Sequence, residues 1–378
     1  MLQIIYYDIV KIFFMTDYGK PLYDNLQYCK RCCMPETNEG IIFDEFGVCQ
    51  ACQSAEQKIH INWKERGEQL RKIFEDYKNK SGNNYDCIIG ISGGKDSTFQ
   101  LYLLTQVYGM NPLAVTFNHT WYNETGLQNI QNAIEKFNVD HLMFTPAKDL
   151  VRRLSKKSLS VIGDICWHCH AGIASTVVNT AIQYKIPLIV WGESVAHASG
   201  RANHFEPVKF DQDYFLKVSA KIPAEKMVDE NISSNDLRPF YSPSKEEYEK
   251  AGLVGVFLSD YIFWDDERQT EFVRDVWGWK EGEPEGTYKG YKSSGCSMVG
   301  LHDYTKFIKR GFGRATDHAS QDVRAGLLTR EEGFELAKKF DTQVPKILDE
   351  YLKNTGITEK EFYEILKKQR EGKAKDIL

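Results

Sequence analysis

A short glycine-rich string, Ser92-Gly93-Gly94-Lys95-Asp96-Ser97, is the strongest candidate for chemistry in this sequence. Gly93 and Gly94 lack a Cβ atom, so their backbone N–H groups can approach a phosphate closely and form an anion-binding nest. The string precedes a helical pattern, and a helix N-terminus adds unpaired N–H groups and a positive dipole end. Ser92 and Ser97 can donate hydrogen bonds, while Lys95 can neutralise charge. We therefore predict a phosphate-binding loop, although it lacks the order of a Walker A loop.

Four cysteines near the N-terminus have the spacing of a metal site. Cys29-x2-Cys32 and Cys49-x2-Cys52 are separated by sixteen residues, which fits the C-x2-C-x15–20-C-x2-C pattern of structural zinc sites. Four sulfur ligands complete a tetrahedral zinc ion and leave no open position. We predict a structural zinc site here, in which the spare thiol of Cys33 could replace Cys32.

A second cysteine pair lies in the string Cys166-Trp167-His168-Cys169-His170. One interpretation is a second metal or iron–sulfur site formed by Cys166, Cys169 and the distant Cys296. The other interpretations are a dithiol and an inert buried segment, because spacing alone does not fix three ligands. His168 and His170 could instead take part in proton transfer.

The segment 306–320 combines basic residues, glycines and an Asp-His pair. Lys309, Arg310 and Arg314 can contact a phosphate or a sugar carboxylate, and arginine suits bidentate contact with either. Asp317 or His318 can move a proton. The plainer interpretation is a basic helix and loop on the protein surface.

The elements that must position these residues alternate between strands and helices. Short apolar runs typical of buried parallel strands lie at 85–91, 113–117, 141–144 and 187–191. Helical patterns lie at 62–79, 96–108, 126–137 and 171–185. This alternation predicts an α/β fold with a doubly wound parallel sheet whose ligand binds at the carboxyl ends of the strands. Capping boxes at Thr329/Glu332 and Thr358/Glu361 predict helices in the C-terminal region.

Composition narrows the classes of partner. The 378 residues carry a net charge of −5, which argues against a broad phosphate-binding surface and so against a nucleic-acid partner. The apolar residues 1–14 are too short to span a bilayer and lack the flanks of a signal peptide. We interpret them as a short packing segment or as lying upstream of an alternative start, and we expect a cytoplasmic protein without a membrane partner.

The loop resembles the PP-loop of the N-type ATP pyrophosphatases, which have an adenine-nucleotide alpha-hydrolase fold. This resemblance implies that Ser92–Ser97 holds the pyrophosphate of ATP and that Asp96 lies beside Mg²⁺. It implies that Phe117, at a strand end, lies where adenosine is bound. It also places Gly192 and Glu193, in the string Trp191-Gly192-Glu193-Ser194, in the nucleotide site.

We expect four regions on this basis. They are an N-terminal extension (1–26), a zinc-ribbon-like unit (27–60), the ATP pyrophosphatase domain (61–200) and a substrate-binding and helical C-terminal region (201–378).

The whole set of motifs is similar to the bacterial N-acetyl sugar amidotransferase family, which serves lipopolysaccharide O-antigen synthesis and nonulosonic acid modification. The set adds Tyr261-x2-Trp264-Asp265 and the string 311–320 to the cysteine unit and the loop. The resemblance implies that ATP adenylates the acetamido oxygen of a sugar such as pseudaminic acid. Ammonia then displaces AMP to give an acetamidino group. Lys95, Asp96, Arg314 and Asp317 are the catalytic candidates.

No glutaminase triad is apparent, so the resemblance also implies a separate glutaminase and a cyclase-like protein that supply ammonia. The expected cofactors are ATP, Mg²⁺ and Zn²⁺, with an iron–sulfur cluster if the second cysteine site forms. Two other functions stay open. One is a PP-loop tRNA thiolation enzyme, and the other is a non-enzymatic zinc-ribbon adaptor that retains a nucleotide fold.

Overall fold

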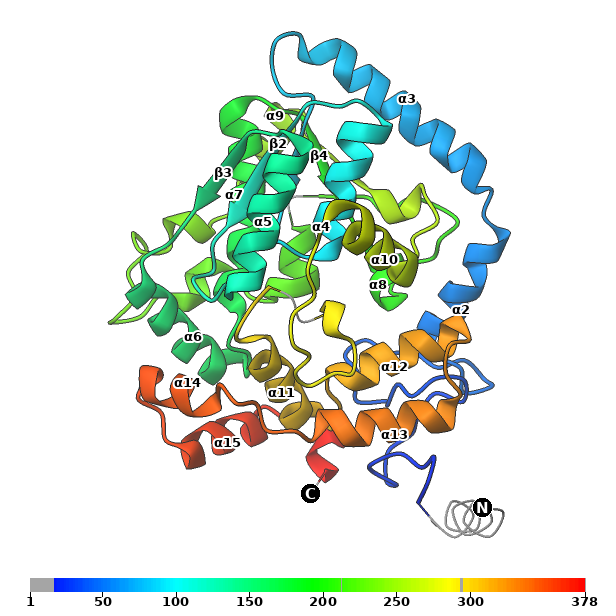
Figure 1. The fold of residues 1–378 in the computed structure, drawn as a ribbon. Coiled ribbons are helices and arrows are strands. Elements are labelled where there is room, and N and C mark those ends of the chain that lie inside the picture. The colour runs from blue at the N-terminus through cyan, green and yellow to red at the C-terminus, as the bar shows by residue number, and fades with distance from the viewer. Residues whose placement is uncertain (1–16, 212, 293–294, 378) are drawn as a thin grey trace.

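The computed structural model describes residues 17–211, 213–292 and 295–377. The segment 1–14 discussed above lies outside the described residues. The centre of the fold is a five-stranded parallel sheet with the order β3-β2-β1-β4-β5 (Figure 1). Its strands are β1 (Cys87–Gly90), β2 (Pro112–Phe117), β3 (His141–Phe144), β4 (Leu188–Trp191) and β5 (Val254–Phe257). The strand order reverses between β1 and β4, which confirms the predicted doubly wound sheet.

The fifth strand was not expected from the sequence. The run Val254–Phe257 lies beyond residue 200, yet it pairs with β4 in register from Leu188↔Val254 to Trp191↔Phe257. Gly255 in this strand allows Phe210 to pack against the backbone, since a Cβ atom there would lie 2.4 Å from the ring. The sheet therefore extends past the expected boundary at residue 200.

The helices occupy most of the remaining chain. In the N-terminal half they are α2 (Gln50–Gln57), α3 (Trp63–Ser81), α4 (Lys95–Tyr102), α5 (Glu124–Phe137), α6 (Lys148–Ile162), α7 (Trp167–Tyr184) and α8 (Val195–Ser199). In the C-terminal half they are α9 (Lys245–Lys250), α10 (Asp266–Trp277), α11 (Val299–Arg310), α12 (Arg314–Ala325), α13 (Arg330–Asp341), α14 (Leu348–Thr355) and α15 (Glu359–Lys368). Both predicted capping boxes are present, at the starts of α13 and α15.

Each face of the sheet packs against its own set of helices. On one face, Ile89 and Ala114 pack with Leu101 of α4 and Ile130 of α5. On the other face, Ile88, Leu113 and Val115 pack with Val177 of α7. These alternating residues are nearly inaccessible to solvent. Burial on both faces explains why β1, β2 and β4 read as continuous apolar runs rather than alternating patterns. The expectation of a buried strand at 141–144 was wrong: β3 lies at the edge of the sheet, and Leu142, Met143 and Phe144 are exposed.

The cysteine unit and the C-terminal helices lie beyond one end of the sheet (Figure 1). The grouping of the four cysteines and the helices from residue 299 onward agree with the predicted N-terminal cysteine unit and helical C-terminal region. Phe312 and Val323 pack against the four cysteines, and the guanidinium of Arg330 donates to the carbonyls of Cys29 and Cys32. No single helix in the described part of the chain is long and apolar enough to cross a membrane. The helices α6 and α7 meet that test only together, and they are bent by 113° at their junction.

Candidate nucleotide and substrate site

The phosphate loop connects β1 to α4 at the point where the strand order reverses. Gly94 has extended dihedral angles and is the N-cap of α4, with no side chain capping the helix. The hydroxyls of Ser97 and Thr98 both donate to the carbonyl of Gly94, at 3.0 and 3.1 Å, and hold the loop in shape. The first-turn N–H groups of α4 are therefore free of a side-chain cap and suited to an anion.

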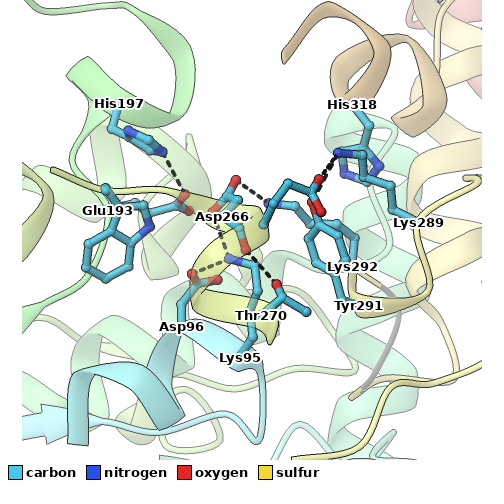
Figure 2. Close-up of polar contacts among 12 residues, drawn as sticks. Lys95, Asp96, Glu193, His197, Asp266, Thr270, Lys289, Tyr291, Lys292 and His318 are labelled. Atoms are coloured by element: carbon cyan, nitrogen blue, oxygen red, sulfur yellow. Dashed lines mark hydrogen bonds and ion pairs between the residues drawn. The ribbon is translucent and has the colours of Figure 1, made fainter. Parts of the chain in front are cut away.

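A charged cluster sits over this helix end (Figure 2). Lys95 is 2% exposed, and its Nζ atom lies 2.7 Å from Asp266 Oδ1 and also contacts the carboxylate of Asp96. Lys292 donates to the other oxygen of Asp266 at 3.0 Å. His197 lies 3.4 Å from Glu193, and ligand atoms of Glu193, His197 and Asp266 lie within 4.8 Å of one another. This arrangement offers several oxygen ligands to a hard cation such as Mg²⁺.

The pKa values in the cluster reflect burial and mutual charge. Burial raises the pKa of Glu193 to about 7, with further contributions from Asp96 and Asp266. Burial also acts to raise the pKa of Asp266, but Lys95 and Lys292 outweigh it and lower that pKa. Burial of Lys95 is likewise outweighed by Asp96 and Asp266, so its pKa is raised. Lys95 and Asp266 are therefore ionised at neutral pH, while Glu193 is close to its midpoint.

Asp266, Lys292 and His197 were not expected from the sequence as site residues. Asp266 directly follows the Tyr261–Asp265 motif, and its place beside that motif was the available sequence signal that it belongs to the site. Asp265 caps α10 by accepting from the N–H of Arg268, which sets Asp266 in the first turn facing Lys95. His197 lies in α8, four residues after Glu193, which precedes the N-cap Ser194. The short spacing of a carboxylate and a histidine in the sequence was the signal for that pair.

Position 93 needs a glycine, because of both its backbone conformation and the closeness of a neighbouring carbonyl group. Its φ is +73°, and a Cβ atom there would lie 2.4 Å from the carbonyl oxygen of Gly126. We expect Gly93→Ala to destabilise the protein by roughly 1–3 kcal/mol through strain and overpacking, measured as a shift in Tm. Gly82→Ala is the matched control, because Gly82 has a φ of +61° and open space around it. Equal decreases in Tm in the two variants would show that the clash with the Gly126 carbonyl does not contribute to the destabilisation.

The other predicted nucleotide residues occupy two different environments. Gly192 follows β4 beside the loop, and a Cβ atom there would lie 2.5 Å from Gln100 Nε2. Phe117 is at the end of β2 as expected, but its ring is 3% exposed and lies under α7. A Cβ atom on Gly172 would lie 2.3 Å from that ring. The Phe117 side chain is therefore part of the core, and only its backbone can face a ligand.

A cavity of about 530 Å³ lies between the cysteine unit, α8, α11 and α12. Its wall includes Arg314, Asp317 and His318, which were predicted from the sequence. Seven cationic side chains line it: Arg201, Lys221, Lys306, Lys309, Arg310, Arg314 and Arg324. The carboxylates in the wall are Glu39, Asp164, Asp303 and Asp317. The excess of positive charge suits an anionic ligand.

The cationic side chains are held in place by specific contacts. Arg314 donates to Asp303 Oδ2 at 2.9 Å, and Lys306 is paired with Asp317. The Nζ atom of Lys309 donates to the carbonyl of Ile162 at 3.1 Å. Burial lowers the pKa of Lys309 to about 8. The Nδ1 atom of His318 contacts the hydroxyl of Thr287 at 2.6 Å, and burial lowers its pKa.

A chain of contacts through Lys292 and Asp266 joins the cavity wall to the phosphate loop. The guanidinium of Arg314 donates to the carbonyl of Lys292. The Nζ atom of Lys292 in turn donates to Asp266 beside Lys95 (Figure 2). Arg314 is the first residue of α12, whose start is fixed by Asp341. That buried carboxylate accepts from Ala315 N at 2.8 Å and from the Thr316 hydroxyl at 2.6 Å. The structure thus links Lys95 to Arg314 through Asp266 and Lys292, although the two parts are far apart in sequence.

The four predicted cysteine ligands form one buried group. Their sulfur atoms all lie within 4.8 Å of one another, with Cys29–Cys52 and Cys32–Cys49 separations of 3.8 and 3.7 Å. Tetrahedral Zn–S bonds of about 2.3 Å place sulfurs about 3.8 Å apart, so this donor set fits zinc. Cys33 stands outside the group and its thiol faces the carbonyl of Arg330 at 3.4 Å. The structure therefore selects Cys32 rather than Cys33 as the ligand.

The second set of cysteines is brought into one region but not into one compact group. Cys166, Cys169 and Cys296 belong to the same apolar cluster, next to Met298. Burial raises the pKa of Cys169, and the thiol of Cys296 adds to that shift. Among the described residues, the group with ligand atoms within 4.8 Å that contains Cys166 pairs it with Asp164 and His302 instead. The Nδ1 atom of His302 lies 3.0 Å from Asp164.

Comparison with known proteins supports the C-terminal part of the resemblance. Residues 285–375 match the family described as the LPS biosynthesis protein WbpG-like, C-terminal domain. This range contains Arg314, Asp317 and most of the C-terminal helices. Two uncharacterized proteins of Methanocaldococcus jannaschii are also similar. MJ1599 is 22% identical over 85% of this chain and 96% of its own length. MJ1016 is 22% identical over 56% of this chain and 69% of its own length.

Several solved structures have partial similarity. The NMN synthetase from Francisella tularensis is 16% identical over 59% of this chain and 98% of its own, with a TM-score of 0.29. The U34-tRNA thiolase NcsA from Methanococcus maripaludis, solved with its 4Fe-4S cluster, is 14% identical over 85% of this chain and 90% of its own, with a TM-score of 0.33. The NH3-dependent NAD synthetase from Campylobacter jejuni is 12% identical over 76% of this chain and 99% of its own, with a TM-score of 0.30. Because these scores are low, the description of the fold rests on the strand order given above.

Proposed function

We propose that this protein is an ATP-dependent amidotransferase that converts the acetamido group of an anionic N-acetyl sugar into an acetamidino group. The observation that carries the proposal is the connection between a phosphate loop and a cationic cavity through Lys292 and Arg314. ATP bound at the loop would face a sugar bound in the cavity. The WbpG-like match over residues 285–375, which includes Arg314, supports the same assignment. ATP consumption of this kind is consistent with a cytoplasmic location.

The chemistry needs an activated oxygen, because an amide oxygen is a poor leaving group. ATP, when bound, supplies the AMP group that turns this oxygen into a good one. Backbone N–H groups at Gly93–Asp96 and the Lys95 amine would bind the departing pyrophosphate as preorganised donors. The carboxylates of Asp96, Glu193 and Asp266 would hold Mg²⁺, and their oxygen-rich, partly exposed cluster fits that ion. The nucleotide role of Gly192 and of the Phe117 backbone stays a prediction.

The cavity would bind the sugar through its charge. A nonulosonic acid such as pseudaminic acid carries a carboxylate, which arginine binds with two parallel hydrogen bonds. Arg314 lines the wall and donates to the carbonyl of Lys292, whose amine contacts Asp266, so we propose that it orients the substrate toward the loop. Asp317, paired with Lys306, is our candidate for proton transfer.

Arg314→Lys is expected to raise the KM for the sugar by about tenfold, because lysine keeps the charge but loses the two-pronged contact. The KM for ATP should change little. Arg268→Lys is the matched control, because Arg268 is 87% exposed and lies outside the cavity wall. Unchanged sugar kinetics in Arg314→Lys would exclude Arg314 from substrate binding.

The proposed reaction is tested by following pyrophosphate release with ammonium salt and an acetamido-bearing nonulosonic acid, together with mass spectrometry of the sugar. Sugar-dependent pyrophosphate, with a mass change equal to replacement of one oxygen by NH, is the expected result. Separate glutaminase and cyclase-like proteins remain our proposal for the ammonia source. Glutamine-dependent turnover by the purified chain alone would contradict that part.

The pH dependence of metal binding is expected to follow Glu193. Its pKa is raised to about 7, so the carboxyl group is protonated below that pH and must lose a proton to bind a cation. The apparent affinity for Mn²⁺ in the presence of ATP should therefore fall as the pH is lowered from 8 to 6. Glu193→Gln should bind Mn²⁺ more weakly and flatten this dependence. Titrations followed by Mn²⁺ spectroscopy check both points, and an unaltered pH profile in Glu193→Gln would assign the titration elsewhere.

A second candidate function is tRNA thiolation, and the shared region of Cys166, Cys169 and Cys296 favours it. Three thiols in one apolar cluster are a donor set that suits an iron–sulfur cluster. The net charge of −5 is against a tRNA partner. Pyrophosphate release that depends on tRNA rather than sugar, together with iron bound by the purified chain and lost in Cys169→Ala, would select this candidate.

A further inference from the structure

A second cavity, of about 260 Å³, adjoins the large one. Four side chains line both cavities: Glu39, Lys221, Lys309 and Arg310. The rest of the smaller cavity is built by the end of α6 and by the C-terminal segment around Gln369 and Glu371. The two cavities are therefore neighbouring compartments with a common partition of four charged side chains.

Ion pairs between distant segments build this partition. Glu39, from the cysteine unit, lies 2.7 Å from Lys221 and 2.9 Å from Arg310, the last residue of α11. Lys309 crosses Gly163, where a Cβ atom would lie 2.6 Å from its Cδ atom. Glu39 has half of its side chain exposed, at 49%. The partition is thus made of side chains, which can move without unfolding a helix or a strand.

The smaller cavity reaches the protein surface. Val161, in its wall, is 43% exposed, and Glu371 on the opposite rim is also exposed. Neither residue lines the large cavity. A small molecule can therefore enter from this side without passing through the mouth of the large cavity.

The proposed reaction needs such a second route. A sugar acid bound in the large cavity, as proposed above, would stand in the way of a second reactant that entered through the same cavity. The second reactant, ammonia, is small and uncharged. We infer that the smaller cavity is the entry for ammonia, which reaches the reacting carbon past the partition of Glu39, Lys221, Lys309 and Arg310. This inference rests on the proposed function.

The charges of the partition suit ammonia rather than ammonium. Three cations face one carboxylate, so a positively charged ammonium ion is repelled while the neutral molecule is not. In the step that follows, the ammonia lone pair forms a bond to the imidate carbon. The C–O bond to AMP breaks with its electrons on the departing phosphate oxygen, and one N–H proton is released to a base. No oxidant or reductant is needed.

Val161→Trp tests the route, because the larger side chain fills the outer part of the smaller cavity. In the complete protein, with ammonium chloride at fixed pH as the probe, we expect the KM for ammonia to rise about tenfold or more. Sugar-dependent pyrophosphate release in a single turnover, measured without ammonia, should stay at the wild-type level. Glu371→Trp, from the opposite rim, should act in the same way. Val344→Trp is the control, because Val344 is 57% exposed and lines neither cavity.

The outcomes separate the inference from the function on which it rests. If ammonia kinetics are unchanged in both rim variants while sugar-dependent pyrophosphate release persists, ammonia enters elsewhere and the inference is wrong. If the rim variants raise the KM for the sugar instead, the smaller cavity belongs to the sugar site and the inference is again wrong. If the wild-type chain releases no sugar-dependent pyrophosphate, the proposed function fails and the ammonia route fails with it.

Discussion

Asp96→Asn is expected to lower sugar-dependent pyrophosphate release by about a hundredfold or more, which is the usual scale for removing one preorganised electrostatic contact. Asp96 lies in the first turn of α4 beside the phosphate loop and contacts Lys95. The asparagine removes a charge that we assign to Mg²⁺ binding but keeps the size of the side chain. Lys95 still retains its contact with Asp266 at 2.7 Å, so the buried amine is not left without a carboxylate.

Stability and activity should therefore separate in this variant. Thermal unfolding of Asp96→Asn is expected to resemble that of the wild type, whereas Asp266→Asn should lower Tm, because it weakens contacts of Lys95 and Lys292 together. Asp76→Asn, on an exposed face of α3, serves as the control for loss of a surface carboxylate. Full activity in Asp96→Asn would remove Asp96 from the catalytic site.

Cys32→Ala is expected to release the metal and to lower Tm by on the order of 10 °C or more, whereas Cys33→Ala should keep both. The two cysteines are adjacent in sequence, but only Cys32 belongs to the group of four sulfurs. Residues 27–57 contribute few large apolar side chains to the core, so the metal carries much of their stability. Elemental analysis should give one zinc ion per wild-type chain.

Loss of this metal should also damage the substrate cavity. Glu39 and Cys49, both from the cysteine unit, line the cavity, and Arg324 of the cavity wall contacts Cys32 Sγ at 3.8 Å. We therefore expect Cys32→Ala to lose sugar-dependent activity as well as stability. Metal retained in Cys32→Ala and lost in Cys33→Ala would reverse the ligand assignment. Iron rather than zinc in the wild type would contradict the assignment of this metal as zinc.

The centre of the sheet could be predicted from the sequence because β1, β2 and β4 are buried on both faces. The runs before Ser92 and before Gly192 are apolar throughout, and each ends in a polar or glycine-rich string. Parallel strands bring such strings together at one edge of the sheet. The neighbourhood of Lys95 and Glu193 could be inferred for this reason. The strand β5 was not predicted, because its four residues include Gly255 and because its pairing with β4 joins segments that are distant in sequence.

The remainder of the site could not be read from spacing. Asp266 and Lys292 join the cluster from segments that lie 171 and 26 residues from their partners, so spacing along the chain does not show that they meet. Phe117 illustrates the opposite case. Its position at the end of a strand predicted contact with a ligand, but Gly172 admits its ring beneath α7. The side-chain direction depends on the helix packed against the strand, and a single sequence does not show that packing.

The most direct test of the proposed function is pyrophosphate release from ATP by the purified protein, with an acetamido-bearing nonulosonic acid and ammonium present or omitted in turn. The proposal predicts that pyrophosphate appears only when the sugar is present, and that the sugar gains an acetamidino group when ammonium is added. Both signals should be lost in Asp96→Asn. Pyrophosphate release that requires tRNA and is indifferent to the sugar would contradict the proposal.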